Sequence, residues 1–299
     1  MKLTVTVVIP AHNEQTNIQA VLRDVLAQKQ SGYSLEKIIV LSDGSSDHTV
    51  ARARLVGNKL ISVVQGKNRI GKAQRLNQIF KVFKSNVLVV LDADIKLADR
   101  MTLANLVRPF TKTLKLGYVS GRMVPLSSRS FLEEAVNVSR SVWDKVRVNW
   151  KNGQNVYTCS GRIYGLSRDF ARVCHFPKTV WPDLGFYYFS CKKLGYNTFW
   201  AQDAVVNFRS PATVADYVGQ ISRYVSENNA LETVFGPRIY EEYKIPKSLL
   251  YKFKLQVLLR YPLQCLVIFI LNAYVSLRKV RYGNISYKRW QMAATTKKI

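Results

Sequence analysis

Acidic residues are scarce in this sequence of 299 residues: 19 Asp and Glu stand against 45 Lys and Arg, a formal net charge of +26. Cysteine and histidine are also scarce, and neither forms the closely spaced pairs that a disulfide scaffold or a CxxC zinc module requires. We therefore expect free thiols in a reducing compartment at Cys159, Cys174, Cys191 and Cys265. So basic a surface attracts polyanions such as nucleic acid, anionic lipid or phosphorylated substrates, and composition alone leaves these three open.

Long hydrophobic runs are few as well. The run Leu3 to Ile9 is too short for a signal peptide and ends at Pro10, and a mean hydropathy of −0.07 excludes a polytopic transporter. The longest uncharged stretch, 261–277, has 17 residues, whereas a membrane-spanning helix needs about 20. It lies in a segment, 243–299, that has 12 Lys and Arg and no Asp or Glu. We expect this segment to span, dip into or lie on an anionic membrane, with an ordinary buried helix as the alternative.

The first hundred residues alternate between β-branched runs and amphipathic segments, a pattern that predicts a mostly parallel sheet flanked by helices. The expected strands are 3–9, 37–41, 60–64 and 86–91, and the expected helices are 14–28, 48–55 and 72–83. After about residue 115 the pattern loosens. There we expect strands at 118–124 and 198–208, a strand or turn at 159–166, and helices at 132–150 and 186–194.

Polar residues follow three of the four early strands, at positions 12–14, 42–44 and 92–94. Because ligands of such sheets bind beyond the carboxyl ends of the strands, these groups are expected to form a site. Asp92 and Asp94 are the sharpest pair, since carboxylates bind hard cations such as Mg²⁺ or Mn²⁺ that also bridge to substrate phosphates. Read alone, the pair is equally consistent with two aspartates that cap a loop.

Two further features are ambiguous when each is read alone. Asp43 is placed either to accept hydrogen bonds from a base or ribose, or to close an Asx turn before Gly44. The loop 65–72 holds two glycines and three cations but lacks the spacing of a Walker loop. It suits either a phosphate site or a solvated basic loop.

In combination the motifs are far more specific. VVIPAHNE at 7–14, LSDGSSDHT at 41–49, NRIGKA with LN at 68–77 and LDAD at 91–94 stand in order and at suitable spacing. With these motifs the sequence resembles the family 2 glycosyltransferases, which have the GT-A fold, from about residue 3 to about residue 225. The resemblance implies a metal site for Mg²⁺ or Mn²⁺ at Asp92 and Asp94. It also implies a nucleotide site, with Asp43 on the base, formed by Pro10, Ala11, Glu14, Asp43, Lys72 and Asp92.

The resemblance also extends to the acceptor side. Ser160 and Gly161 look like the acceptor-side segment of the family. Gln220, Arg223 and Tyr224 are similar to the QxxRW motif of membrane-bound, polymer-making members, with tyrosine in place of tryptophan. An aromatic ring is retained there, so stacking on a sugar is preserved. The alternative for this last segment is an amphipathic helix whose arginine is paired elsewhere.

The general base implied by the resemblance is Asp183. It would take the proton of the acceptor hydroxyl in a single displacement that inverts the anomeric carbon. The family usually shows two adjacent acids at this place, whereas Asp183 stands between Pro182 and Leu184. Either the position is shifted by one residue or the base is altered.

These observations predict an α/β protein of the GT-A type, Rossmann-like, with a basic, apolar helical tail. The expected domains are a catalytic domain at 1–240, with a nucleotide-binding half at 1–115 and an acceptor half at 116–240, and a membrane-associating tail at 241–299. The expected activity is inverting, metal-dependent transfer of a sugar from a UDP-linked donor to a lipid-linked or polysaccharide acceptor. The expected location is the cytoplasmic face of the cell membrane, as a peripheral, monotopic or single-span protein.

Two alternatives remain. One is transfer of a single sugar to a polyprenyl phosphate. The other is a non-catalytic basic protein that binds a membrane or nucleic acid, which the net charge favours and the three intact aspartates disfavour. The expected partners are a nucleotide-sugar donor, a saccharide or lipid-linked acceptor and an anionic membrane surface, with a membrane partner or homo-oligomer needed for any polymer export. Nucleic acid is not an expected partner. Deletion of the residues after about 245 is expected to release the protein from membranes.

Overall fold

The computed structural model describes residues 2–177, 184–279 and 294–297. The chain forms two compact units. The first comprises Met1–Val124, Cys159–Phe208 and Lys297–Ile299, and the second comprises Pro125–Thr158 and Arg209–Thr296.

The first unit is built on one sheet, to which the described residues contribute eight strands in the order β3–β2–β1–β4–β7–β6–β8–β5. Strands β3, β2, β1 and β4 are parallel, whereas β7 runs antiparallel to β4 and β6, and β5 runs antiparallel to β8. The strands are β1 Leu3–Ala11, β2 Tyr33–Asp43, β3 Ile61–Gly66, β4 Val87–Leu91, β5 Lys96–Leu97, β6 Leu116–Pro125, β7 Ile163–Ser167 and β8 Asn197–Phe208.

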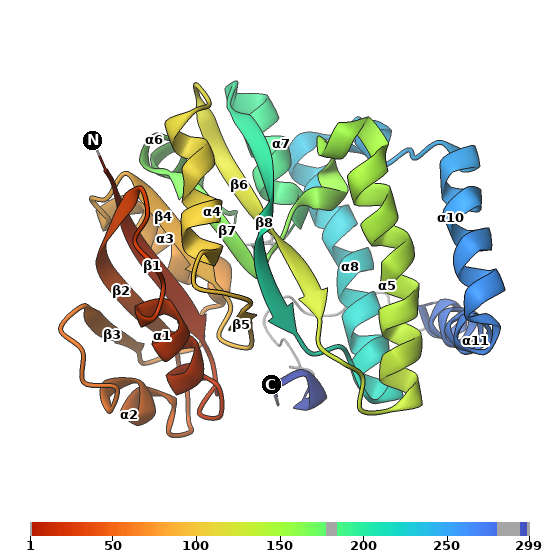
Figure 1. Ribbon diagram of the computed structural model, residues 1–299, viewed down its shortest axis with the longest axis horizontal. Coiled ribbons are helices and arrows are strands. Elements are labelled where there is room, and N and C mark those ends of the chain that lie inside the picture. Colours follow the sequence, from red (N-terminus) through yellow and green to blue (C-terminus); the bar gives the residue numbers. More distant parts are fainter. Residues whose placement is uncertain (1, 178–183, 280–293, 298–299) are drawn as a thin grey trace. The chain divides into compact units, whose positions relative to one another are not determined.

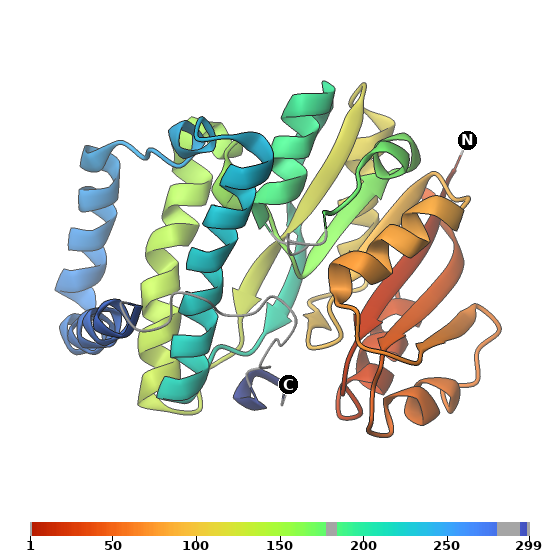
Figure 2. The ribbon, with the colours of Figure 1, turned by 180° about the vertical axis from the view of Figure 1, so that it is seen from behind.

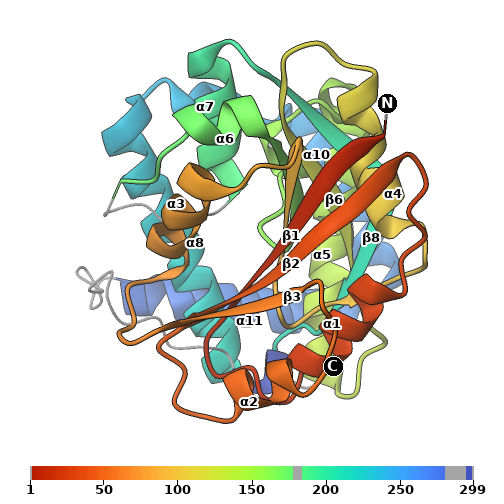
Figure 3. The ribbon, with the colours of Figure 1, turned by 90° about the vertical axis from the view of Figure 1, so that its left-hand side faces the viewer.

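Helices cover both faces of this sheet, as the alternating pattern predicts. Figure 3 shows α1 and α3 on opposite sides of the strands β1, β2 and β3. In Figure 2, which is turned by 180° from Figure 1, α3 lies in front of these strands. The helices of the first unit are α1 Ile18–Leu26, α2 Thr49–Arg54, α3 Lys72–Val82, α4 Thr102–Val107, α6 Arg168–Val173 and α7 Leu184–Leu194, with the 3-10 turn η1 Arg108–Thr111.

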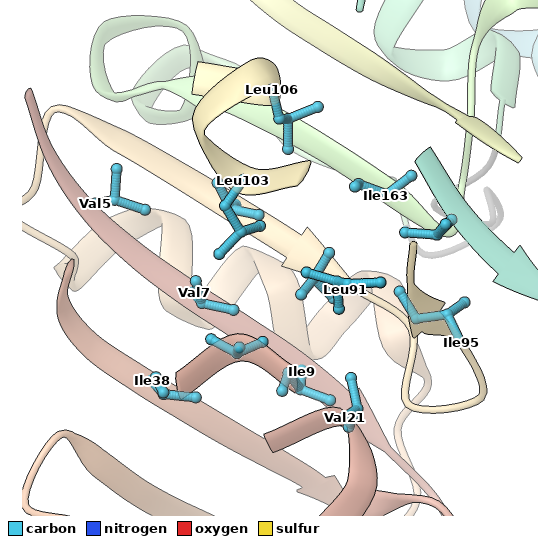
Figure 4. Packing of buried hydrophobic residues seen from close by; sticks show 14 of the residues in the cluster. Val5, Val7, Ile9, Val21, Ile38, Leu91, Ile95, Leu103, Leu106 and Ile163 are labelled. Carbon is cyan, nitrogen blue, oxygen red and sulfur yellow. The ribbon is translucent and has the colours of Figure 1, made fainter. Parts of the chain in front are cut away.

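The main core lies between the sheet and the helices α1 and α4. Val5, Val7 and Ile9 alternate along β1 toward this side and are fully buried, as the period of a strand requires. Figure 4 shows them packed with residues of α1, α4 and the neighbouring strands. Every residue of β4 is buried, which fits its central position between β1 and β7.

The predicted elements of the first hundred residues are confirmed in kind and order, but some bounds differ. Helix α1 begins at Ile18 rather than at Glu14, and it is preceded by a turn in which the carbonyl of Glu14 accepts the backbone N–H groups of Asn17 and Ile18. Strand β2 begins at Tyr33, four residues earlier than the apolar run. It starts early because it pairs with β1 along the whole length of that strand.

The second unit is helical in its described part, and Figure 1 labels its four longest helices. Side-chain hydroxyl groups cap the amino-terminal ends of two of these helices. Ser130 accepts the N–H of Glu133 at the start of α5, and Thr213 accepts the N–H of Asp216 at the start of α8. Its elements are α5 Phe131–Asn149, α8 Val214–Phe235, α9 Ile239–Glu242, α10 Lys247–Arg260 and α11 Pro262–Lys279, with the 3-10 turns η2 Trp150–Gly153 and η3 Val156–Thr158. A further 3-10 turn, η4 Ala294–Lys297, ends in the first unit.

The apolar stretch 261–277 forms α11, and it is buried on one face only. Ile268, Leu271 and Val275 pack in a core with side chains of α5 and α8, while Phe253 and Val257 of α10 pack in a second core with α5. Among the described residues, none of the helices combines the length and the hydrophobicity that crossing a bilayer requires. The predicted boundaries at 115 and 240 were drawn from motifs and composition, and they stay predictions.

Candidate active site

The predicted donor residues follow three neighbouring strands of the sheet. Pro10 and Ala11 end β1, Asp43 ends β2, and Asp92 and Asp94 follow β4. Because the order is β2–β1–β4 and all three strands are parallel, their carboxyl ends lie along the same edge. The structure thus brings together the three polar segments that the sequence placed at strand ends.

Asp43 joins this edge to the loop before α3. Its Oδ1 accepts hydrogen bonds from the backbone N–H of Ile70 and from Nε of Arg75, both at 2.9 Å, and its Oδ2 accepts the N–H of Gly71 at 2.8 Å. Nη2 of Arg75 also donates to the carbonyl of Asn68 at 2.6 Å. The carboxylate therefore fixes the basic loop, and the predicted contact with the base stays a prediction.

Two glycines make room for this arrangement. Gly44 has a φ of +65°, and a Cβ there would lie 2.8 Å from the backbone nitrogen of Arg69. A Cβ on Gly66 would lie 1.8 Å from the guanidinium of Arg75. A side chain at position 44 would push the loop away from Asp43, and one at position 66 would displace the guanidinium of Arg75.

Lys72 connects the donor loop, the aspartate pair and the acceptor segment. Its Nζ lies 2.6 Å from Oδ1 of Asp92 and donates to the carbonyl of Gly161 at 2.9 Å. The backbone N–H of Asp92 donates to the carbonyl of Arg162 at 2.9 Å. This double link follows from the antiparallel pairing of β4 and β7, which places the start of β7 beside the end of β4.

Asp94 is paired with a different cation. Nη1 of Arg162 lies 3.1 Å from Oδ1 of Asp94, and its guanidinium lies 4.8 Å from the centre of the Phe208 ring. Burial raises the pKa of Asp94, and the charge of Asp92 adds to this, while the guanidinium of Arg162 opposes it. Each aspartate of the pair therefore has its own positive partner.

Glu14 is nearly buried, with 7% of its surface exposed. Its Oε1 lies 2.7 Å from Nζ of Lys297 and its Oε2 accepts a hydrogen bond of 3.1 Å from Nδ2 of Asn17. Burial, with a contribution from the charge of Asp94, raises the pKa of Glu14 to about 7, against the lowering effect of Lys297. Glu14 thus belongs to the same electrostatic group as the aspartate pair.

The predicted acceptor segment is hydrogen-bonded to a buried tyrosine, Tyr118. The hydroxyl of Tyr118 accepts the N–H of Ser160 at 2.9 Å and donates to its carbonyl at 3.0 Å. Oγ of Ser160 accepts the N–H groups of Arg162 and Ile163, both at 3.3 Å. Ser160 therefore shapes the turn, while Gly161 offers its carbonyl to Lys72.

The roles of four further predicted residues are not decided by the part of the chain that the structure describes. Asp183 lies outside the described residues. Gln220, Arg223 and Tyr224 belong to α8 in the second unit, where Gln220 is buried, and the side chains of residues 222–229 lie outside the description. The roles of these four residues stay predictions.

Sequence reasoning missed three cations at this edge. Arg75 shares a face of α3 with buried Ile79, four residues later, and a buried arginine signals a buried acid. Arg162 directly follows the predicted acceptor pair, so its position was a usable signal. Lys297 gave no local signal, because it meets Glu14 only through the fold.

The fold is that of the GT-A glycosyltransferases. A mannosyltransferase from Pyrobaculum calidifontis, solved with GDP-Man and Mn²⁺, superposes with a TM-score of 0.58 at 18% identity, over 95% of this chain and 77% of that one. Glucosyl-3-phosphoglycerate synthase from Mycobacterium tuberculosis, solved with Mn²⁺, UDP and phosphoglyceric acid, gives 0.54 at 21% identity, over 78% and 79%. These likenesses confirm the predicted fold class.

Residues 6–173 match the sequence model of the family described as Glycosyl transferase family 2. This is more than half of the chain, so the protein belongs to that family and is a glycosyltransferase. It is 34% identical over 119 residues to the poly-beta-1,6-N-acetyl-D-glucosamine synthase of Staphylococcus aureus (strain COL), covering 39% of this chain and 28% of that protein. It is 27% identical over 120 residues to the 4,4'-diaponeurosporenoate glycosyltransferase of Staphylococcus haemolyticus (strain JCSC1435), covering 39% and 31%. The matches thus cover less than a third of these relatives.

Asp92 and Asp94 fit a divalent cation that takes its other ligands from a substrate. The described residues contain no cluster of three or more His, Cys, Asp or Glu side chains around one point. Mg²⁺ and similar ions, however, bind commonly through one or two carboxylates together with phosphate oxygens and water. An ammonium and a guanidinium already lie on the two carboxylates, which marks the place as one where positive charge is stabilised.

Proposed function

We propose that this protein is an inverting, metal-dependent glycosyltransferase that uses a UDP-linked sugar and extends a polysaccharide or lipid-linked saccharide. The observation that carries the proposal is the contact of Lys72 with both Asp92 and Gly161. It joins the donor loop, the aspartate pair and the acceptor segment at one point. A donor diphosphate bound there lies beside the acceptor.

Different residues of the edge would contribute to different parts of the sugar transfer. A bound Mg²⁺ or Mn²⁺ would neutralise the charge that develops on the leaving diphosphate. Asp92 and Asp94 would hold it, and Lys72 and Arg162 would supply further positive charge to the diphosphate. The turn at Ser160 and Gly161 would position the acceptor, and Asp183 would take the proton of its hydroxyl.

The choice of donor and acceptor rests on the relatives. The Staphylococcus aureus synthase is named for a polymer of N-acetyl-D-glucosamine, and the mycobacterial structure holds UDP. We therefore propose UDP-linked N-acetylglucosamine as the first donor to test, with a growing saccharide as the acceptor. The mannosyltransferase complex holds GDP-Man, which makes GDP-mannose the matched competitor.

The experiment is a donor screen with product analysis. The full-length protein is incubated with UDP- and GDP-sugars in Mn²⁺, Mg²⁺ or EDTA, and release of the nucleoside diphosphate is measured. We expect release from a UDP-sugar that requires the metal. If no nucleotide sugar is bound or cleaved with either metal, the proposed function is wrong.

Mass analysis of the product separates the two enzymatic alternatives. Polyprenyl phosphate and a short saccharide are offered together as acceptors with the donor found in the screen. A lengthened saccharide supports the proposal. A lipid that carries one sugar and is never extended supports transfer to polyprenyl phosphate instead.

We further propose that α10 and α11 hold the second unit on the cytoplasmic face of an anionic membrane. Large apolar side chains recur at helical spacing on the outer side of both helices. The exposed residues are Tyr251, Leu255, Leu258, Leu259, Leu263, Leu266, Phe269, Ile270, Tyr274 and Leu277, and we call them the apolar face. Lysine and arginine flank the apolar face, and no acidic residue lies between 243 and 299, as suits an anionic leaflet.

The polar residues within the apolar stretch support the same orientation. Nε2 of Gln264 donates to Glu134 of α5 at 3.1 Å, and Oδ1 of Asn272 accepts a hydrogen bond of 2.8 Å from Tyr217 of α8. Helix α11 therefore bonds its two amides to neighbouring helices and exposes Leu263, Leu266 and Leu277, while Leu271 is buried.

The deletion after residue 245 is not a clean test of this location. It would remove Phe253, Val257 and Ile268 from the cores of the second unit, so the remainder would expose apolar surface of its own. Substitutions on the apolar face avoid this, because they leave the buried sides of α10 and α11 unchanged.

A further inference from the structure

The ammonium group of Lys297 lies in a site made by the turn between β1 and α1. Its Nζ is 2.7 Å from Oε1 of Glu14, and it donates to the carbonyls of His12 and Asn13 at 3.1 and 2.5 Å. The carbonyl of Lys297 in turn accepts a hydrogen bond of 2.6 Å from Nδ2 of Asn17. The turn therefore binds both the side chain and the main chain of this lysine.

The acceptors of this site match the donors of an ammonium group in number. A lysine has three N–H donors, and the turn offers one carboxylate oxygen and two carbonyl oxygens. Lys297 is thus fully ligated by the protein, unlike a lysine that reserves donors for a substrate phosphate. Its role is to hold the turn.

The turn that Lys297 holds is part of the donor edge. Nδ1 of His12 lies 2.7 Å from the carbonyl of Asp43, and Asn13 exchanges hydrogen bonds with Ser45 and Ser46. Asn13 has a φ of +53°, a left-handed conformation that asparagine adopts more readily than most non-glycine residues. The loops after β1 and β2 are therefore one connected structure, with Lys297 bound at its end.

Glu14 depends on this lysine. Both carboxylate oxygens meet protein donors, Oε1 at Lys297 and Oε2 at Asn17, and little of the side chain is exposed. Without the ammonium group, a buried carboxylate would remain beside the charge of Asp94 with one partner fewer, which is unfavourable. The turn would have to shift or take up a proton.

We propose that Lys297 is a positioning residue of the donor site, which fixes the turn 12–14 by filling the ammonium site formed by Glu14 and two backbone carbonyls. The role as a donor-site residue rests on the proposed function. Glu14 then serves Lys297 rather than the nucleotide, and donor binding depends on a residue from the far end of the sequence.

The docking of Lys297 is tested without any nucleotide. The native protein is treated briefly with an amine-acetylating reagent, and the modified lysines are quantified by mass spectrometry. We expect Lys297 to react several-fold more slowly than the exposed Lys59, and to react as fast as Lys59 once Glu14→Gln removes its charged partner. Equal rates in the unsubstituted protein would overturn the proposal.

The effect on the donor is tested by chemical rescue. Lys297→Ala should bind UDP with Mn²⁺ about tenfold more weakly, the loss expected for a charged hydrogen-bonded pair, whereas Lys59→Ala should bind normally. Propylammonium replaces the missing part of the side chain and should restore most of the affinity. Tetramethylammonium at the same concentration has no N–H donors and should not. The UDP affinity of Lys297→Arg should lie between those of the unsubstituted protein and Lys297→Ala.

The outcomes distinguish this inference from the proposed function. Normal or tighter UDP binding by Lys297→Ala, or equal effects of the two ammonium ions, would overturn the positioning role and leave the enzyme assignment intact. Absence of UDP and GDP binding in the unsubstituted protein would remove the donor role together with the proposed function. The acetylation result would still decide whether Lys297 is docked.

Discussion

The two units of this protein differ in the side chains that are costly to place. The first unit pairs its acidic side chains with cations, whereas the second exposes large apolar side chains to solvent. In the first unit, each acid at the donor edge has a positive partner from another part of the chain. The pairs are Asp43 with Arg75, Asp92 with Lys72, Asp94 with Arg162, and Glu14 with Lys297. In the second unit, the large apolar side chains of α10 and α11 lie exposed on one side of each helix.

This difference indicates where each unit needs something from outside. The charges of the donor edge are balanced internally, so a ligand there must exchange for existing contacts, and a metal ion with an anionic nucleotide brings charges of both signs. The apolar face is not compensated in this way. Exposing its side chains to water is unfavourable, and this free energy falls only when another apolar phase covers them.

The largest effect is expected from Arg75→Met. This change leaves Asp43 as a buried carboxylate without its cation, and both side chains of the pair are about 10% exposed or less. Breaking a buried pair costs about 3–5 kcal/mol, which urea unfolding followed by circular dichroism would measure. The matched control is Arg54→Met on the surface of α2. A loss below about 1 kcal/mol would contradict the internal balance described above.

Asp94→Asn should weaken Mn²⁺-dependent UDP binding about a hundredfold, because one of the two carboxylates that we propose as metal ligands loses its charge. Calorimetric titration with UDP, in Mn²⁺ and in EDTA, measures the change. The control is Asp203→Asn, whose side chain is 77% exposed. If the two variants bind UDP alike, the aspartate pair is not the metal site.

The stability of the metal-free protein should fall as the pH rises through the titration of Glu14. Its pKa is raised to about 7, mainly by burial and also by Asp94, so the folded state holds a proton that the unfolded chain loses near pH 4.5. The favourable contribution is complete below about pH 4.5 and is lost by about pH 7.

Glu14→Gln removes this titration. We expect the difference in unfolding free energy between pH 5 and pH 8, measured in EDTA, to become roughly 2 kcal/mol smaller. Glu241→Gln, at a side chain that is 66% exposed, should leave the difference unchanged. An unchanged difference in the Glu14 variant would mean that Glu14 is already ionised at pH 5.

The smallest effect is expected from Leu259→Ser on the apolar face. Leu259 is 77% exposed, so folding should not suffer, but one leucine less in contact with lipid should lower partition into anionic vesicles about tenfold. Sedimentation with vesicles measures it, and Leu114→Ser, at an exposed leucine of the first unit, is the control. Equal sedimentation of both variants would contradict membrane contact through α10.

Much of the fold was predictable because its signals are local. The strands β1 to β4 each contain a short run rich in β-branched or apolar residues, and α1 carries the repeat of Ile18, Val21, Leu22 and Val25 that faces the core. The donor edge followed from polar residues at strand ends. These are consequences of a sheet that buries both faces, and they require no knowledge of distant partners.

The partners of the donor acids were not predictable in this way. Nothing near Glu14 in the sequence indicates Lys297, and Asp94 meets Arg162 only because β7 pairs antiparallel with β4. The sequence alone left two interpretations of the apolar stretch 261–277, a membrane-associated segment and a buried helix, for a different reason. Hydropathy averages over all sides of a helix, whereas α11 has a buried side and an exposed side that only its packing against α5 and α8 reveals.

The docking of Lys297 also has a practical consequence for handling the protein. Amine-reactive dyes and cross-linkers that neutralise lysine would remove the charge that Glu14 and the carbonyls of His12 and Asn13 bind. Nucleotide affinities are therefore best measured on protein that carries no label on its lysines.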